Sequence, residues 1–105
     1  MSKFAMAFNI GKTNEERIEA FNLYQEAFHA KKISEAAPPN GGDLHIVMDL
    51  AGTRILLAPG GKVQKITENA MCCEFHFDSE NDLKKAYQIL ARQSLRCSLE
   101  GPYPW

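Results

Sequence analysis

The chain has 105 residues, of which 45% are apolar and 24% charged, and its net charge is -1 from 12 basic and 13 acidic side chains. This length suits one domain with a modest core, and the composition is typical of a soluble globular protein. The sequence contains no basic tract, which disfavours nucleic acid and anionic membranes as partners, and no apolar run near the ~20 residues that cross a bilayer. The N-terminus lacks the apolar stretch of a signal peptide, so we expect a cytoplasmic protein.

The first half of the chain predicts a strand, a helix and three further strands. Residues 3–10 alternate between large apolar side chains and small or polar ones, as a strand does. Thr13, with Glu16 three residues later, is a capping-box signature, so we expect a helix over residues 14–29. The strands expected after this helix span residues 31–39, 43–51 and 54–58, and the last two form a hairpin that turns at Ala51–Gly52.

The second half begins with the same order of elements. Residues 71–78, MCCEFHFD, alternate like a strand, and Ser79 with Asp82 three residues later indicates the start of a helix. Residues 94–100 predict another strand. The apolar face of this second helix is expected to consist of Leu83, Ala86, Tyr87, Leu90 and Ala91. That of the first helix is expected to consist of Ile18, Phe21, Tyr24 or Gln25, and Phe28.

These two halves align as an internal repeat of a strand followed by a capped helix. Phe8 and Ile10 align with Phe75 and Phe77, and the apolar positions of the two helices then align as well. The second copy is shorter than the first by roughly one hairpin. A repeated unit of this kind predicts two modules that pack together.

Three segments resemble one known superfamily. YQEAFHAKKI is similar to a helix end, DLHIVMDLAGTRILLA to a β-hairpin whose first strand often carries a His, and CSLEGPYPW to the approach to a second hairpin. With the repeat, they make the chain resemble the vicinal-oxygen-chelate superfamily, also called glyoxalase/bleomycin-resistance/dioxygenase, and within it the PhnB-like branch.

The resemblance implies a single α+β domain, residues 1–105, built from paired βαβββ modules. Module one would span about residues 1–61, and a partial module two, which lacks its last hairpin, about residues 71–105. The two modules of this superfamily form a curled mixed sheet with the helices on its convex face, and the concave face encloses a ligand cavity.

The metal ligands of the superfamily do not carry over to this chain. The first strand offers only Ala5, Ala7 and Asn9 on its cavity side, and Cys72 stands where the second module usually has a His. Cys72 and Cys73 are adjacent and would point to opposite faces of a strand, so the cysteine spacing disfavours a zinc site. We therefore expect no metal site and no cofactor, with a divalent metal as the less favoured alternative.

Polar side chains on the concave face are the candidate ligand-binding residues. Cys72, Glu74 and His76 alternate with the apolar residues of one strand, and His45, Val47 and Asp49 do so in another. An imidazole beside a carboxylate can move protons, which makes Glu74 and His76 the catalytic candidates. The alternative is a hydrated face whose polar groups satisfy one another. The ligand-binding candidates are His45, Val47, Arg54, Cys72, Glu74 and His76. For Arg54 the favoured alternative is an ordinary surface residue beside a turn.

A partial second module would leave a sheet edge open, and open edges pair with other strands. We therefore expect a homodimer through this edge and through the apolar tail Pro102–Trp105, which would otherwise face water. The favoured function is a protein that binds a small organic ligand, with neither nucleic acid nor membrane as partner. The alternatives are a lyase- or isomerase-type enzyme that uses His76 or Glu74, and a truncated relic that only assembles.

Overall fold

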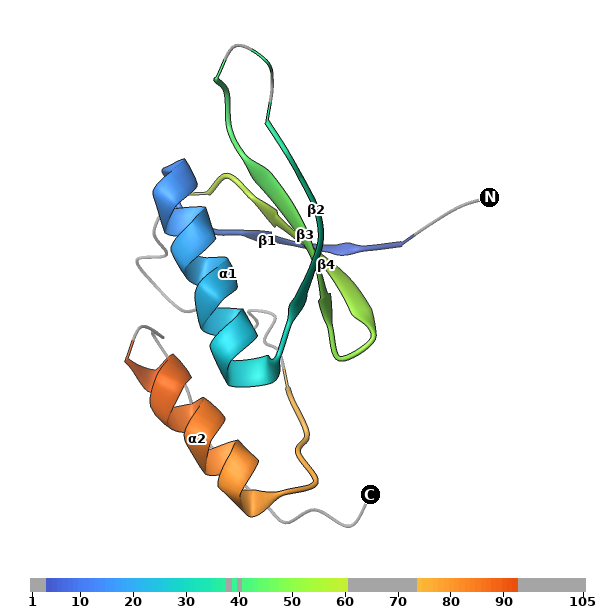
Figure 1. The fold of residues 1–105 in the computed structure, drawn as a ribbon, viewed down its shortest axis with the longest axis vertical. Coiled ribbons are helices and arrows are strands. Elements are labelled where there is room, and N and C mark those ends of the chain that lie inside the picture. The colour runs from blue at the N-terminus through green and yellow to red at the C-terminus, as the bar shows by residue number, and fades with distance from the viewer. Residues whose placement is uncertain (1–3, 38, 40, 61–73, 93–105) are drawn as a thin grey trace, which may run out of the picture. The chain divides into compact units, whose positions relative to one another are not determined.

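The computed structural model describes residues 4–37, 39, 41–60 and 74–92 of the chain (Figure 1). The chain divides into two compact units, Met1–Gln64 and Lys65–Trp105. The helix of the second unit is α2 (Glu80–Ala91). The elements of the first unit are β1 (Met6–Asn9), α1 (Asn14–Phe28), β2 (Lys31–Ala36), β3 (His45–Leu50) and β4 (Thr53–Ala58).

The five elements of the first unit form one four-stranded mixed sheet with a single helix. The strand order is β1-β4-β3-β2, in which β1 is parallel to β4 and the other neighbours are antiparallel. A β-bulge interrupts the pairing of β2 with β3 between Lys32 and Ser34. The predicted order of a strand, a helix and three strands is therefore confirmed. β1, β2 and β3 are shorter than their predictions, whereas β4 begins one residue earlier than predicted.

The second unit differs from its prediction before α2. Residues 74–77 belong to no strand, although side chains of alternate residues lie on the same side, as in an extended segment. A strand requires backbone hydrogen bonds to a neighbour as well as alternation, and alternation is all that a single sequence displays. The rest of that predicted strand, residues 71–73, and the strand predicted over residues 94–100 lie outside the described part of the chain.

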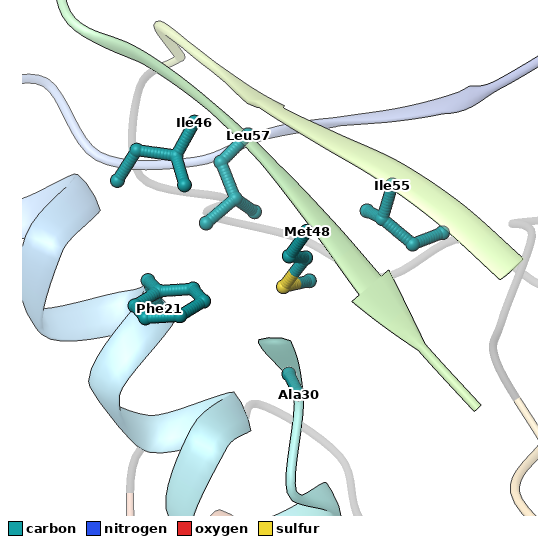
Figure 2. Close-up of a cluster of buried hydrophobic side chains, with 6 residues drawn as sticks. All are labelled: Phe21, Ala30, Ile46, Met48, Ile55 and Leu57. Atoms are coloured by element: carbon teal, nitrogen blue, oxygen red, sulfur yellow. The ribbon is translucent and has the colours of Figure 1, made fainter. Parts of the chain in front are cut away.

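The core of the first unit lies between α1 and one face of the sheet. Figure 2 shows Phe21 of α1 facing the side chains of β3 and β4, with Ala30 of the following turn beside them. The strands supply Ile46, Met48, Ile55 and Leu57, all at most 3% exposed. This is the face that the alternation in residues 43–51 predicted, since successive strand residues point to opposite sides.

Both helices begin at the predicted N-cap residues. The hydroxyl of Thr13 accepts a hydrogen bond from the backbone N–H of Glu16 at 3.2 Å, and that of Ser79 accepts one from Asp82 at 3.3 Å. The capping box around Thr13 is incomplete, because the carboxylate of Glu16 accepts from the backbone N–H of Lys12 and not from that of Thr13. α1 ends at His29, whose left-handed backbone (φ 57°) turns the chain into β2.

The buried face of α1 is rotated from its prediction, because Ile18 is 43% exposed and Arg17 is fully buried in its place. Arg17, Phe21, Tyr24 and Phe28 follow one another at helical spacing, so a charged residue occupies the N-terminal position of an otherwise apolar stripe. In α2 the buried residues are Ala86 and Ile89, whereas Ala91 of the predicted face is exposed. Ile89 and Ala86 are three positions apart and so share one helix face.

Arg17 donates hydrogen bonds to two residues that precede it in the sequence, Gly11 and Asn14. Its Nη1 donates to the backbone carbonyl of Gly11 at 2.6 Å, and its Nη2 donates to Oδ1 of Asn14 at 2.6 Å. The carboxylate of Asp43 lies 3.6 Å from Nη2, but it is largely exposed and adds little to stability. Nε of Arg17 is buried and finds no hydrogen-bond partner among the described residues.

The two acceptors of Arg17 are shared with other segments of the first unit. Oδ1 of Asn14 also accepts from the backbone N–H of Leu44 at 2.9 Å, which ties the loop before β3 to the start of α1. The carbonyl of Gly11 also accepts from the N–H of Gly60 at 3.2 Å, just after β4. Gly11 has a φ of +80°, and a Cβ there would lie 3.0 Å from the backbone nitrogen of Arg17.

We expect the Asn14→Ala variant to be strongly destabilised. It removes the acceptor of two donors, a buried guanidinium N–H and the backbone N–H of Leu44, and each buried donor left unsatisfied costs about 1–3 kcal/mol. The Asn14→Asp variant keeps the oxygen and adds a charge opposite to that of Arg17, but it loses the 3.4 Å bond that Nδ2 of Asn14 donates to the carbonyl of Gly42, so it should lose less stability than Asn14→Ala. Urea unfolding followed by circular dichroism measures both. Equal losses in the two variants would contradict this role of Asn14.

Candidate functional site

The face of the sheet opposite α1 carries one group of candidate residues. His45, Val47 and Asp49 of β3 alternate with the buried residues of that strand, and all three are half-buried. The register places Val47 beside Leu56 of β4 and Asp49 beside Arg54. α1 is the only helix described between residues 4 and 60, and it packs against the other face, so none of the described elements of this unit covers these side chains.

This open face has an apolar centre and polar ends. The middle row across the strands is Ala7, Leu56, Val47 and Ser34. The row toward the β3–β4 turn contains Lys31, Asp49 and Arg54, two cations on either side of an anion. The opposite end contains His45, which pairs with Ala36. An apolar patch with a charged border suits a small organic molecule that has an acidic group.

Two polar groups of this face already have backbone partners. Oδ1 of Asp49 accepts from the N–H of Gly52 at 2.7 Å, which closes the turn between β3 and β4. Nδ1 of His45 lies 3.2 Å from the carbonyl oxygen of Asp43. Asp49 therefore has a structural task, whereas Arg54 and Lys31 are exposed at the border and can be reached by a ligand from solvent.

The second group of candidates lies just before α2. Nε2 of His76 is 2.8 Å from a carboxylate oxygen of Glu74, and both side chains are about half or more exposed. The rings of Phe75 and Phe77 meet on the other side of the segment, with centroids 4.8 Å apart. Glu74 orients one ring nitrogen of His76, which is the arrangement that acid–base catalysis by an imidazole uses.

The six predicted ligand-binding residues therefore fall into two sets. His45, Val47 and Arg54 lie on one face of the first unit, and Glu74 and His76 contact each other in the second. Cys72 lies outside the described residues. Leu56 was missed as a binding candidate, although its place between Ile55 and Leu57 in an alternating strand puts it opposite the core.

Comparison with known proteins assigns no function to either set of residues. The chain matches no family model, no curated protein and no solved structure. In the described part of the chain, neither helix has the length and apolar composition that crossing a membrane requires.

Metal binding is tested by the distances between potential ligands. Across residues 4–60 and 74–92, apart from residues 38 and 40, no three His, Cys, Asp or Glu side chains come close enough to hold an ion. The Glu74–His76 pair supplies two ligands, whereas zinc sites in proteins use at least three. The expectation of a metal-free protein remains a prediction, because Cys72 is not described.

Elemental analysis of the purified protein should therefore detect less than stoichiometric zinc, iron, manganese or copper. The physical reason is that two ligands on an exposed segment bind such ions too weakly to retain them through purification. The Glu74→Gln variant is the control, because it removes one ligand and should leave the metal content unchanged. A stoichiometric metal that disappears in this variant would mean that a metal site forms around His76.

Proposed function

We propose that the chain is a cytoplasmic small-molecule-binding protein of the glyoxalase/bleomycin-resistance type. In this proposal it is PhnB-like, lacks the usual metal site of that superfamily, and works as a homodimer. What supports the family is the order β1-α1-β2-β3-β4 in one mixed sheet, which is the order of elements in a βαβββ module.

One observation carries the binding function, namely the two unlike faces of the sheet. α1 covers the face formed by Ile46 and Leu57, whereas the opposite face presents Val47 and Leu56 with Arg54 at its border. No described helix of their own unit covers these apolar side chains. A ligand that buries them would gain about 25 cal/mol of binding free energy for each Å² of apolar surface removed from water. The guanidinium of Arg54 selects among apolar ligands for those with a carboxylate, sulfonate or phosphate group.

The fluorescent probe 8-anilinonaphthalene-1-sulfonate tests this function, because it has an apolar body and one anionic group. We expect the Arg54→Gln variant to bind it about fivefold more weakly, since an exposed ion pair contributes up to about 1 kcal/mol. The Leu56→Glu variant should abolish binding, because it places a carboxylate in the apolar centre. The measurement is a fluorescence titration of folded protein, checked by circular dichroism.

The Lys32→Gln variant is the matched control for Arg54→Gln. Lys32 is also an exposed cation on a strand, but it lies on the other face, with its ammonium 5.3 Å from the centre of the Phe21 ring. Its loss should leave probe binding unchanged. An equal loss in both variants would show that the probe responds only to net charge, and an absence of binding to wild type would favour a protein that only assembles.

The contact between Glu74 and His76 favours a second candidate function, a lyase- or isomerase-type enzyme. If His76 is a general acid or base, the His76→Ala variant should lose about 10²–10⁴-fold in rate on a compound that wild type converts, with unchanged affinity. A loss of affinity alone would instead assign His76 to ligand binding. The Glu80→Gln variant is the control, because Glu80 is an exposed acidic residue of the same unit and forms an ion pair with Lys84 at 3.0 Å.

A further inference from the structure

The two edges of the sheet differ in their protection against pairing with another chain. β2 forms one edge, and it carries Lys31, Lys32 and Glu35 as well as a β-bulge, all of which discourage a further strand from adding there. β1 forms the other edge, and residues 4–10, FAMAFNI, contain no charged side chain and no proline. Among the strands that the structure describes, β1 is therefore the edge on which another strand can add.

The backbone groups that β1 presents at its free edge follow from its pairing with β4. Ile10 donates its N–H to the carbonyl of Ala58 at 2.9 Å, and Phe8 is paired with Leu57. Backbone groups of alternate residues point to opposite sides of a strand, so the even-numbered residues face β4. Ala5 and Ala7 then direct their N–H and C=O groups toward the free edge.

The sequence of this edge is a palindrome, Phe4-Ala5-Met6-Ala7-Phe8. When two copies of one strand pair antiparallel across a twofold axis, a palindrome places each residue beside its own type. An axis at Met6 pairs Ala5 with Ala7 of the second copy, which are the residues whose backbone groups are directed outward. The same axis puts Phe4 beside Phe8 of the second copy, in the non-hydrogen-bonded position where side chains lie closest.

Phe4 is the side chain that would be covered by a phenylalanine of the second copy. It is 85% exposed, the highest value among the exposed large apolar side chains of the described residues. In the paired arrangement it would extend an aromatic row already present in each copy, in which the rings of Phe8 and Tyr24 are 6.0 Å apart and those of Tyr24 and Phe28 are 6.2 Å apart. Cross-strand aromatic pairs are among the more stabilising pairs in sheets.

On the premise of the homodimer proposed above, we infer that its seam is β1 against β1 of a second copy, in place of the second-module edge and the tail Pro102–Trp105 that were expected from the sequence. The strands run antiparallel with the twofold axis at Met6, and the two four-stranded sheets become one. This arrangement satisfies the outward backbone groups of Ala5 and Ala7 and covers Phe4. It leaves the open face of Val47, Leu56 and Arg54 free for a ligand in each copy.

The first test is the mass in solution of wild type and two lysine variants, measured by sedimentation equilibrium. Wild type should have twice the chain mass of 11.8 kDa. The Phe4→Lys variant should raise the dissociation constant at least about tenfold, since two ammonium groups would enter the seam. Ile33→Lys is the matched control, because Ile33 is an exposed apolar residue on the protected edge, and this variant should remain a dimer.

The outcomes separate the seam from the homodimer itself. A monomeric wild type would overturn both, whereas a dimer that Phe4→Lys leaves intact would overturn the seam and keep the homodimer. If Phe4→Lys fails to fold, Ala7→Pro replaces it, because proline removes an N–H that faces away from β4. Probe binding by a monomeric variant that retains its fold would show that the ligand site does not depend on the seam.

Disulfide cross-linking tests the position of the axis, in a background with Cys72, Cys73 and Cys97 changed to serine. The Met6→Cys variant should form a covalent dimer on oxidation, since directly opposed residues at a non-hydrogen-bonded position have Cα atoms about 4.5 Å apart, within disulfide range. Ala7→Cys should cross-link far less. A covalent dimer of Ala7→Cys without one of Met6→Cys would overturn the proposed register.

Discussion

The guanidinium of Arg17 joins three backbone segments that the rest of the first unit depends on. It binds the carbonyl of Gly11 between β1 and α1, and through Asn14 it reaches the N–H of Leu44 at the start of β3. The same Gly11 carbonyl accepts from Gly60 after β4. Burying Arg17 has a cost, because its charge leaves water and its Nε–H finds no acceptor among the described residues. A buried charge of this kind is tolerated only where fixed acceptors surround it.

Much of the first unit could be predicted from its sequence, because local signals there agree with one another. Alternation predicted the two faces of β3, and Thr13 marked the start of α1. Arg17 could not be predicted in this way, since hydrophobic periodicity assigns a charged residue to the solvent side and its acceptors come from distant loops. The strand predicted over residues 71–78 fails at residues 74–77 for a related reason, because a strand depends on a neighbour that its own sequence does not contain.

The sequence predicted which face of the sheet carries the candidate site, but it predicted less well which residues form that site. Alternation placed His45 and Val47 on the face away from α1, and the structure confirms that placement. Leu56 at the centre of this face was not predicted, because polarity marked the binding candidates. The surface that a ligand would contact is instead largely apolar. The proposed ligand site and the proposed seam use different parts of the same sheet, a face and an edge. A ligand and a second copy can therefore be bound at the same time.

The parallel pairing of β1 with β4 also affects the order in which the first unit forms. β2, β3 and β4 are neighbours in sequence, so their hairpins close short loops, whereas β1 must wait for β4 at the other end of the unit. During synthesis the earliest strand is thus the last to enter the sheet. Until then its apolar residues are unpaired and can pair with β4 of another nascent chain, so a low concentration of nascent chains favours pairing within one chain.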